Sequence, residues 1–206
     1  MTITTPKSAE YIMQEVAAIQ YLYGLKREIR YAMTRTKEDA TESVAEHVYG
    51  MHICALYFLP LENPGGDWDR TLISDMITVH DIDEIETGDV LGYTKTDAIR
   101  AAEADAMRIV MNKSPEHMRP RMSEAIDAYD VQETPEARFV KAIDKFEPLI
   151  QTYNEAGKQI FQRNKTTIAN AVSIKEPYLR DFPVMYEFYK TIHAQMVAED
   201  FFYPDN

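Results

Sequence analysis

Histidine and acidic side chains that could bind a metal ion are concentrated in one short stretch of the sequence. His80 and Asp81 are adjacent, and four more acidic residues follow within eight positions of Asp81: Asp83, Glu84, Glu86 and Asp89. His80 ends an apolar helical stripe, so carboxylates beside it would be costly unless a cation compensated them. The stretch therefore predicts a divalent metal ion bound at His80 and Asp81.

Two further ligands are expected from distant parts of the chain. His47 lies on the apolar face of an expected helix, where a histidine taken alone is more often a hydrogen-bonded core residue. Asp144 lies on the apolar face of FVKAIDKF, where an unpaired charge is unfavourable, although a salt bridge with Lys141 or Lys145 would also satisfy it. Two imidazoles and two carboxylates give an N2O2 ligand set with positions left for water and a phosphate oxygen. This is a catalytic type of site.

The elements that would position these ligands are helices. Apolar residues recur mostly at spacings of three and four, and no credible pair of strands is found. Ser43 and Glu46 have the spacing of a capping box, and Thr94 and Asp97 repeat it. The pattern predicts six or seven helices in an all-α orthogonal bundle. Five of them are expected over about 5–30, 43–60, 68–80, 94–111 and 183–198. A shorter helix is opened by Ser114-Pro115 and disturbed by Pro120, and another begins at Thr134-Pro135.

Length, composition and charge limit the class of protein. A chain of 206 residues with 45% apolar and 27% charged residues is ordinary for one globular domain over 1–206. It has no apolar N-terminal segment and no run of about 18 apolar residues, so we expect no membrane partner and a cytoplasmic location. The only cysteine, Cys54, is expected to be buried. The net charge of −12 argues against nucleic-acid polymers, whereas a small phosphorylated substrate needs only local positive charge.

Three segments resemble the HD-domain 5'-deoxynucleotidase family: ESVAEH, which ends in His47, VHDIDEIETGD, and ARFVKAIDKFEPLIQ, which contains Asp144. The similarity covers about residues 25–153, and 154–206 are expected to form helices packed on this core. The order His, then His-Asp, then Asp is far more specific than an HD dipeptide. The resemblance implies an all-α bundle, usually a homodimer, that hydrolyses the phosphate ester of a small nucleotide, a nucleoside monophosphate.

The resemblance also implies a role for each matching residue. Glu84 and Asp89 match the acidic residues of the family's HDxxExxxGD motif, which serve catalysis and substrate positioning. Arg30 matches an arginine that contacts the phosphate, and Arg35 falls where a second basic residue is common; for each, a solvated helix end is the alternative. One divalent ion, Co, Mn, Zn, Ni or Fe, is expected on the metal ligands His47, His80, Asp81 and Asp144.

Two departures from the family and three alternative functions remain. The family often has a tryptophan after the arginine, thought to crowd the sugar's 2' position, where this chain reads RYAMTR. Phosphate ester hydrolysis is therefore better supported than preference for deoxyribose. Pro148 replaces an aliphatic residue and predicts a helix kink. The alternatives are action on di- or triphosphates, a catalytically weak nucleotide sensor, and an HD-type di-iron oxygenase, whose additional ligands we do not find.

Overall fold

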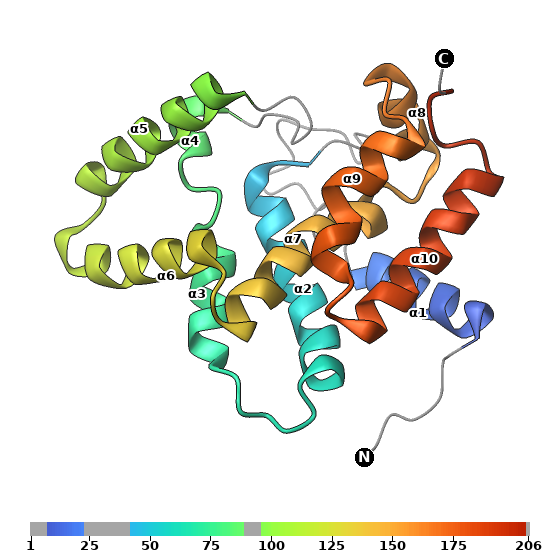
Figure 1. Cartoon of the computed structure of the whole chain (residues 1–206), viewed down its shortest axis with the longest axis horizontal. Helices are drawn as coiled ribbons and strands as arrows, with labels where there is room; N and C mark the ends of the chain where they lie inside the picture. The colour runs from blue at the N-terminus through green and yellow to red at the C-terminus, as the bar shows by residue number, and fades with distance from the viewer. Residues whose placement is uncertain (1–7, 23–41, 89–95, 205–206) are drawn as a thin grey trace, which may run out of the picture. The chain divides into compact units, whose positions relative to one another are not determined.

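The computed structural model describes residues 8–22, 42–88 and 96–204 (Figure 1). All regular elements in these ranges are helices, which confirms the all-α class, and none of them is both long and apolar enough to cross a membrane. The helices of these ranges outnumber the six or seven expected, because two lie within 155–179 and a further one, of four residues, follows His80 over 84–87. They are α1 (Ala9–Leu22), α2 (Val44–Glu62), α3 (Arg70–Val79), α4 (Glu84–Thr87), α5 (Asp97–Lys113), the 3-10 turn η4 (Glu116–Met118), α6 (Arg119–Val131), α7 (Pro135–Thr152), α8 (Glu155–Arg163), α9 (Ile168–Leu179) and α10 (Pro183–Ala198).

The chain divides into two compact units. The first unit combines the residues up to Asp67 with those from Ala142 onward, and the second unit is Trp68–Lys141. The division falls inside α7, so the helix contributes its first turns to the second unit and its remaining turns to the first. The single domain expected over 1–206 stays a prediction.

Aromatic packing joins three helices in the first unit. The ring of Phe58 on α2 meets Phe146 of α7 and Phe188 of α10 edge to face, at centroid distances of 5.0 and 5.1 Å, and all three are buried. Such pairs bury large apolar areas in fixed geometry. Cys54 is fully buried on the same helix, as predicted. The core of the first unit therefore holds the α2 face that carries His47 against α7.

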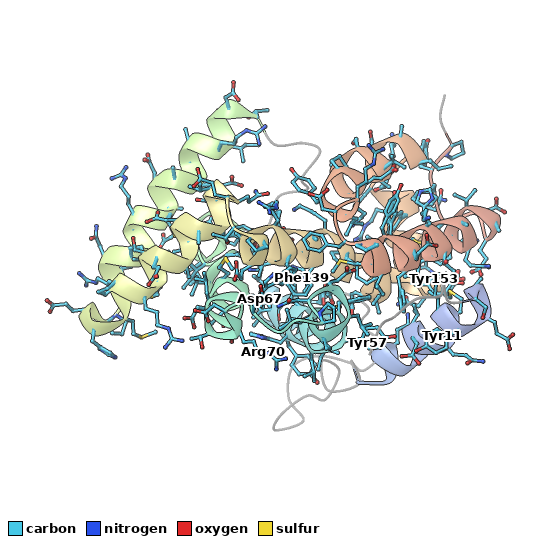
Figure 2. All side chains as sticks on the ribbon, turned by 60° about the horizontal axis from the view of Figure 1, so that its bottom comes forward. Tyr11, Tyr57, Asp67, Arg70, Phe139 and Tyr153 are labelled. Carbon is cyan, nitrogen blue, oxygen red and sulfur yellow. The ribbon has the colours of Figure 1, made fainter. Side chains whose placement is uncertain are left out.

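A tyrosine cluster joins α1 to α2 within the same unit. Tyr57 of α2 is hydrogen-bonded with Glu15 and Tyr11 of α1. Figure 2 labels the two tyrosines on their helices. Burial and these hydrogen bonds raise the pKa of Tyr57, so its hydroxyl stays protonated at neutral pH. Ile12 and Val16 of α1 are buried. The cluster supplements apolar packing with a polar contact between the two helices.

Helix α2 begins where the sequence predicts. The Ser43 hydroxyl accepts a hydrogen bond from the backbone N–H of Glu46, and the Glu46 carboxylate accepts one from the backbone N–H of Ser43 at 2.6 Å. This reciprocal pair satisfies two N–H groups that have no partner inside the helix. The helix continues through Pro60 to Glu62, two residues beyond the expected end. The cap starts the helix one turn before His47.

Caps and prolines decide the helix starts in the second unit. Asp69 accepts hydrogen bonds from the backbone N–H groups of the first turn, so α3 starts at Arg70 and not at Trp68. Thr96 caps α5, whereas Thr94 lies outside the described residues. Pro120 stands in the first turn of α6, where its missing N–H removes no helical hydrogen bond. The helix expected from Ser114-Pro115 is interrupted: it opens as the 3-10 turn η4, and the α-helix begins only at Arg119, next to Pro120.

The capping box of α2 gives the first prediction. Ser43→Ala should lower the free energy of unfolding by about 1 kcal/mol, because the Glu46 N–H loses its acceptor. Urea unfolding followed by circular dichroism measures the change. Ser173→Ala is the control, since this exposed serine of α9 bonds only a carbonyl of its own helix, and it should change stability by less than about 0.5 kcal/mol. Equal losses in both variants would contradict the role of the cap.

Candidate metal centre

His47 contacts two carboxylates in the first unit. On α2, its Nε2 lies 3.7 Å from Oδ1 of Asp144 on α7, and these two side chains are 13% and 11% exposed. Its Nδ1 lies 2.8 Å from Oε2 of Glu147, one turn further along α7, and Glu147 is fully buried. Glu42, just before α2, also offers an oxygen to this group, since ligand atoms of Glu42, His47 and Glu147 lie within 4.8 Å of one another. Each imidazole nitrogen thus faces an acidic group.

The hydrogen bond to Glu147 decides which nitrogen of His47 can bind a cation. An ionised carboxylate can only accept, so Glu147 assigns a proton to Nδ1. Nε2 and Oδ1 of Asp144 then face each other with lone pairs, and two lone pairs repel unless a proton or a metal ion lies between them. A carboxylate that accepts from the distal nitrogen of a metal-binding histidine is a common support in metal sites. The donor set of His47 and Asp144 fits a divalent metal.

The same arrangement raises the affinity of His47 for a proton. Burial by itself lowers its pKa, but the hydrogen bonds and charges of Asp144 and Glu147 outweigh burial and raise the pKa well above the usual value. In the metal-free protein at neutral pH, a proton therefore occupies the nitrogen that a metal would need. Metal and proton compete for Nε2.

Asp144 also forms the salt bridge that the sequence left open as an alternative. Lys145 Nζ lies 2.9 Å from Oδ2 of Asp144, whereas Lys141 Nζ donates to the hydroxyl of Tyr129 at 2.8 Å. The ion pair engages one oxygen of Asp144, and the other is the oxygen that faces His47. The salt bridge and metal binding by Oδ1 are therefore compatible.

His80 and Asp81 form a similar pair in the second unit. His80 caps the C-terminal end of α3 and is buried. Its Nδ1 lies 3.1 Å from the carbonyl oxygen of Ile77 and must donate there, because a carbonyl only accepts. Its Nε2 lies 3.0 Å from Oδ2 of Asp81, and its ring packs against Tyr129 at 5.2 Å. Again Nδ1 is held by a protein acceptor and Nε2 stands beside a carboxylate.

Glu84 lies one turn after this pair. Its backbone N–H donates to the carbonyl of Asp81 at 3.1 Å, and it begins the short helix α4 with its side chain partly exposed. The helix ends at Gly88, whose φ of 72° lies in the left-handed region that favours glycine. Of the other predicted site residues, Asp89, Arg30 and Arg35 lie outside the described residues.

Sequence reasoning missed Glu147 and Lys175. Glu147 follows Asp144 by three residues, which places both on one face of α7, and this spacing was a signal that could have identified it. Lys175 is a buried lysine of α9 that lies in the electrostatic field of Asp144 and Glu147. Its sequence surroundings contain no signal for that position.

An all-α chain with two histidine–carboxylate pairs in the order His, His-Asp, Asp is the pattern of an HD domain. Residues 22–185 match the family model described as HD domain, and the chain belongs to this family. It is 29% identical over 130 residues to human 5'-deoxynucleotidase HDDC2, covering 62% of this chain and 61% of the human protein. It is 30% identical over 121 residues to 5'-deoxynucleotidase hdd1 of Schizosaccharomyces pombe, covering 56% and 59%. The chain thus spans about six tenths of the length of these curated relatives.

A solved structure shares the fold. It comes from Magnetospirillum magnetotacticum and is described as a predicted metal-dependent phosphohydrolase. The similarity has a TM-score of 0.66 at 18% identity and covers 96% of this chain and all of the other. At this identity the match supports the HD-type helical fold.

Competition between proton and metal gives the second prediction. Because the pKa of His47 is raised, the protonated imidazole stabilises the metal-free fold below a pH of about 6.5, and this contribution is lost as the pH rises through the raised value. At pH 7, Mn²⁺ binding should therefore release about one proton per ion, an effect of linkage. Calorimetry in two buffers of different ionisation enthalpy measures it.

A second histidine of α2 supplies the control. His47→Gln should abolish this proton release and weaken binding. His52→Gln should leave both unchanged, because burial lowers the pKa of His52 and keeps it neutral at pH 7. Undiminished proton release by His47→Gln would contradict the assignment.

Proposed function

We propose that this protein is a metal-dependent phosphohydrolase in which His47, His80, Asp81 and Asp144 bind one divalent ion. The observation that carries the proposal is that both histidines have Nδ1 bonded to a protein acceptor and Nε2 beside a carboxylate oxygen. That the two pairs share one ion is supported by the order of these residues in the chain and by the HD-domain family match. Cobalt, manganese, zinc, nickel and iron all suit such nitrogen and oxygen ligands.

The proposed reaction is attack of water on the phosphorus of a phosphate ester. The bound ion would polarise a phosphoryl oxygen and acidify water. Glu84 or Asp89 would orient the attacking water or accept its proton. Arg30 and Arg35 would hold the phosphate through charge-assisted hydrogen bonds and neutralise the charge that develops on it. Glu147 would keep the imidazole of His47 in the orientation that ligation requires.

Nucleoside 5'-monophosphates, and deoxynucleotides among them, are the proposed substrates. Support comes from the names of the human and fission yeast relatives and from the three segments that resemble that family. The sequence RYAMTR stands where the family often has a tryptophan, so ribonucleotides also belong to the candidate substrates. Di- or triphosphates and a sensor without turnover are the competing functions. A cytoplasmic location and a homodimer belong to the same proposal, and the latter rests on the family resemblance.

Phosphate release from a nucleotide panel tests the function. With Co²⁺, Mn²⁺ or Zn²⁺, the protein should release inorganic phosphate from nucleoside 5'-monophosphates, and chelation should abolish turnover. Comparison of deoxyribose with ribose substrates measures sugar preference. Release of pyrophosphate from triphosphates alone would show that the substrate class is wrong, and binding without any release would identify a sensor.

Two acidic substitutions separate metal binding from catalysis. Asp144→Ala should lower metal content and remove the stabilisation that the ion gives the native state. Asp89→Asn keeps the shape of the side chain but cannot accept a proton, so turnover should fall roughly a hundredfold or more while metal content stays near one. Metal analysis and phosphate release measure both effects, with Asp127→Asn on the exposed face of α6 as the control. If Asp89→Asn lost its metal or kept full activity, Glu84 would take the role given to Asp89.

A further inference from the structure

The first unit buries a lysine next to its metal-site carboxylates. Among its described residues, the charged side chains that are buried are Asp144, Glu147 and Lys175. Lys175 is 7% exposed, and its Nζ donates a hydrogen bond to the backbone carbonyl of Lys145 at 2.9 Å. Lys145 directly follows Asp144, so a side chain of α9 holds the backbone of the turn that carries both carboxylates.

Burying an ammonium group is costly unless negative charge compensates it. Burial and the neighbouring Lys145 lower the pKa of Lys175 to about 8, while Asp144 and Glu147 act in the opposite direction. Lys175 thus remains mainly charged at neutral pH. Two carboxylates on one helical turn repel each other, and a cation that interacts with both offsets that repulsion. The lysine and the carboxylates stabilise one another in the interior.

The backbone of α7 needs an external restraint at this turn. The helix continues through Pro148, which has no N–H and so cannot donate to the carbonyl of Asp144. One helical hydrogen bond is missing where Asp144 and Glu147 must keep their distances to the two nitrogens of His47. The bond from Lys175 to the next carbonyl, that of Lys145, adds a tie from α9 at the weakened place.

We propose that Lys175 is a positioning residue of the metal centre: it holds the turn of α7 so that Asp144 faces Nε2 of His47 and Glu147 binds Nδ1. This inference rests on the proposed function only in that a divalent ion binds at His47 and Asp144. Lys175 itself touches neither substrate nor metal.

A positioning role and a simple charge effect predict opposite results. If Lys175 acted only as a positive charge near the ion, removing it would strengthen cation binding by relieving repulsion. If it acted only as packing, its removal would reduce stability without a specific effect on the metal. Under the proposal, Lys175→Met weakens Mn²⁺ binding about tenfold to a hundredfold, the range seen when supporting groups of metal ligands are removed.

The experiment is calorimetric titration of the metal-free full chain with Mn²⁺, with nitrogen NMR of the His47 imidazole as a second readout. Lys158→Met is the matched control, because Lys158 also donates to a backbone carbonyl, that of Glu199 at 2.6 Å, but this carbonyl belongs to the end of α10 and not to α7. We expect Lys158→Met to bind Mn²⁺ like the wild type. Lys175→Met should weaken binding and shift the imidazole signals, because Glu147 is displaced from Nδ1.

A double variant tests whether Lys175 acts through the carboxylates. With Glu147→Gln already in place, adding Lys175→Met should weaken Mn²⁺ binding by much less than it does in the wild type, as expected for coupled residues. If Lys175→Met does not fold, Lys175→Gln takes its place: its amide can still donate, but it is shorter and uncharged, so it should weaken Mn²⁺ binding in the same direction and to a smaller extent. Unchanged or tighter Mn²⁺ binding, or full additivity with Glu147→Gln, would overturn the inference. Absence of Mn²⁺ binding by the wild type would instead refute the proposed function.

Discussion

The first unit depends on the hydrogen bond between Nδ1 of His47 and the buried carboxylate of Glu147. At 2.8 Å it assigns a proton to Nδ1, so Nε2 is the nitrogen at which a second proton and a cation would compete. The partners are 100 residues apart in sequence, so the bond exists only when α2 and α7 are packed correctly. The Phe58, Phe146 and Phe188 rings supply that packing. Packing of the core and orientation of the His47 imidazole thus depend on the same pair of helices.

The two histidine–carboxylate pairs are oriented by different acceptors. His80 donates to the carbonyl of Ile77, three residues earlier in the chain, so its orientation follows from the end of α3. His47 instead relies on an ionisable side chain of another helix. A backbone carbonyl cannot change its charge, whereas a buried carboxylate responds to the charges around it. Perturbation of the core should therefore affect the His47 pair more than the His80 pair.

Positive groups lie close to the buried carboxylates of the first unit in the absence of a metal. Lys145 pairs with one oxygen of Asp144, and Lys175 lies in the field of Asp144 and Glu147. Buried ionic groups contribute little net stability, because desolvation cancels much of their attraction. Their retention here is explained by what they hold in place, namely a nitrogen and an oxygen facing each other across 3.7 Å. The proposed cation site would in this way be preorganised within an acidic protein.

Local signals in the sequence determined the helical class, the start of α2 at the Ser43 cap and the extent of α10, because capping and apolar periodicity involve residues three or four apart. They also predicted that His80 and Asp81 lie side by side, because the two residues are adjacent in the chain. Tertiary structure alone decided that Asp144 pairs with Lys145, that Glu147 holds His47, and that Lys175 is buried beside them. The contacts of Glu147 with His47 and of Lys175 with the backbone of α7 join helices distant in the chain, so they depend on packing that no local pattern specifies. Asp144 had two lysine partners available within its own helix, and the folded environment, in which Lys141 bonds Tyr129, left Lys145 as the partner.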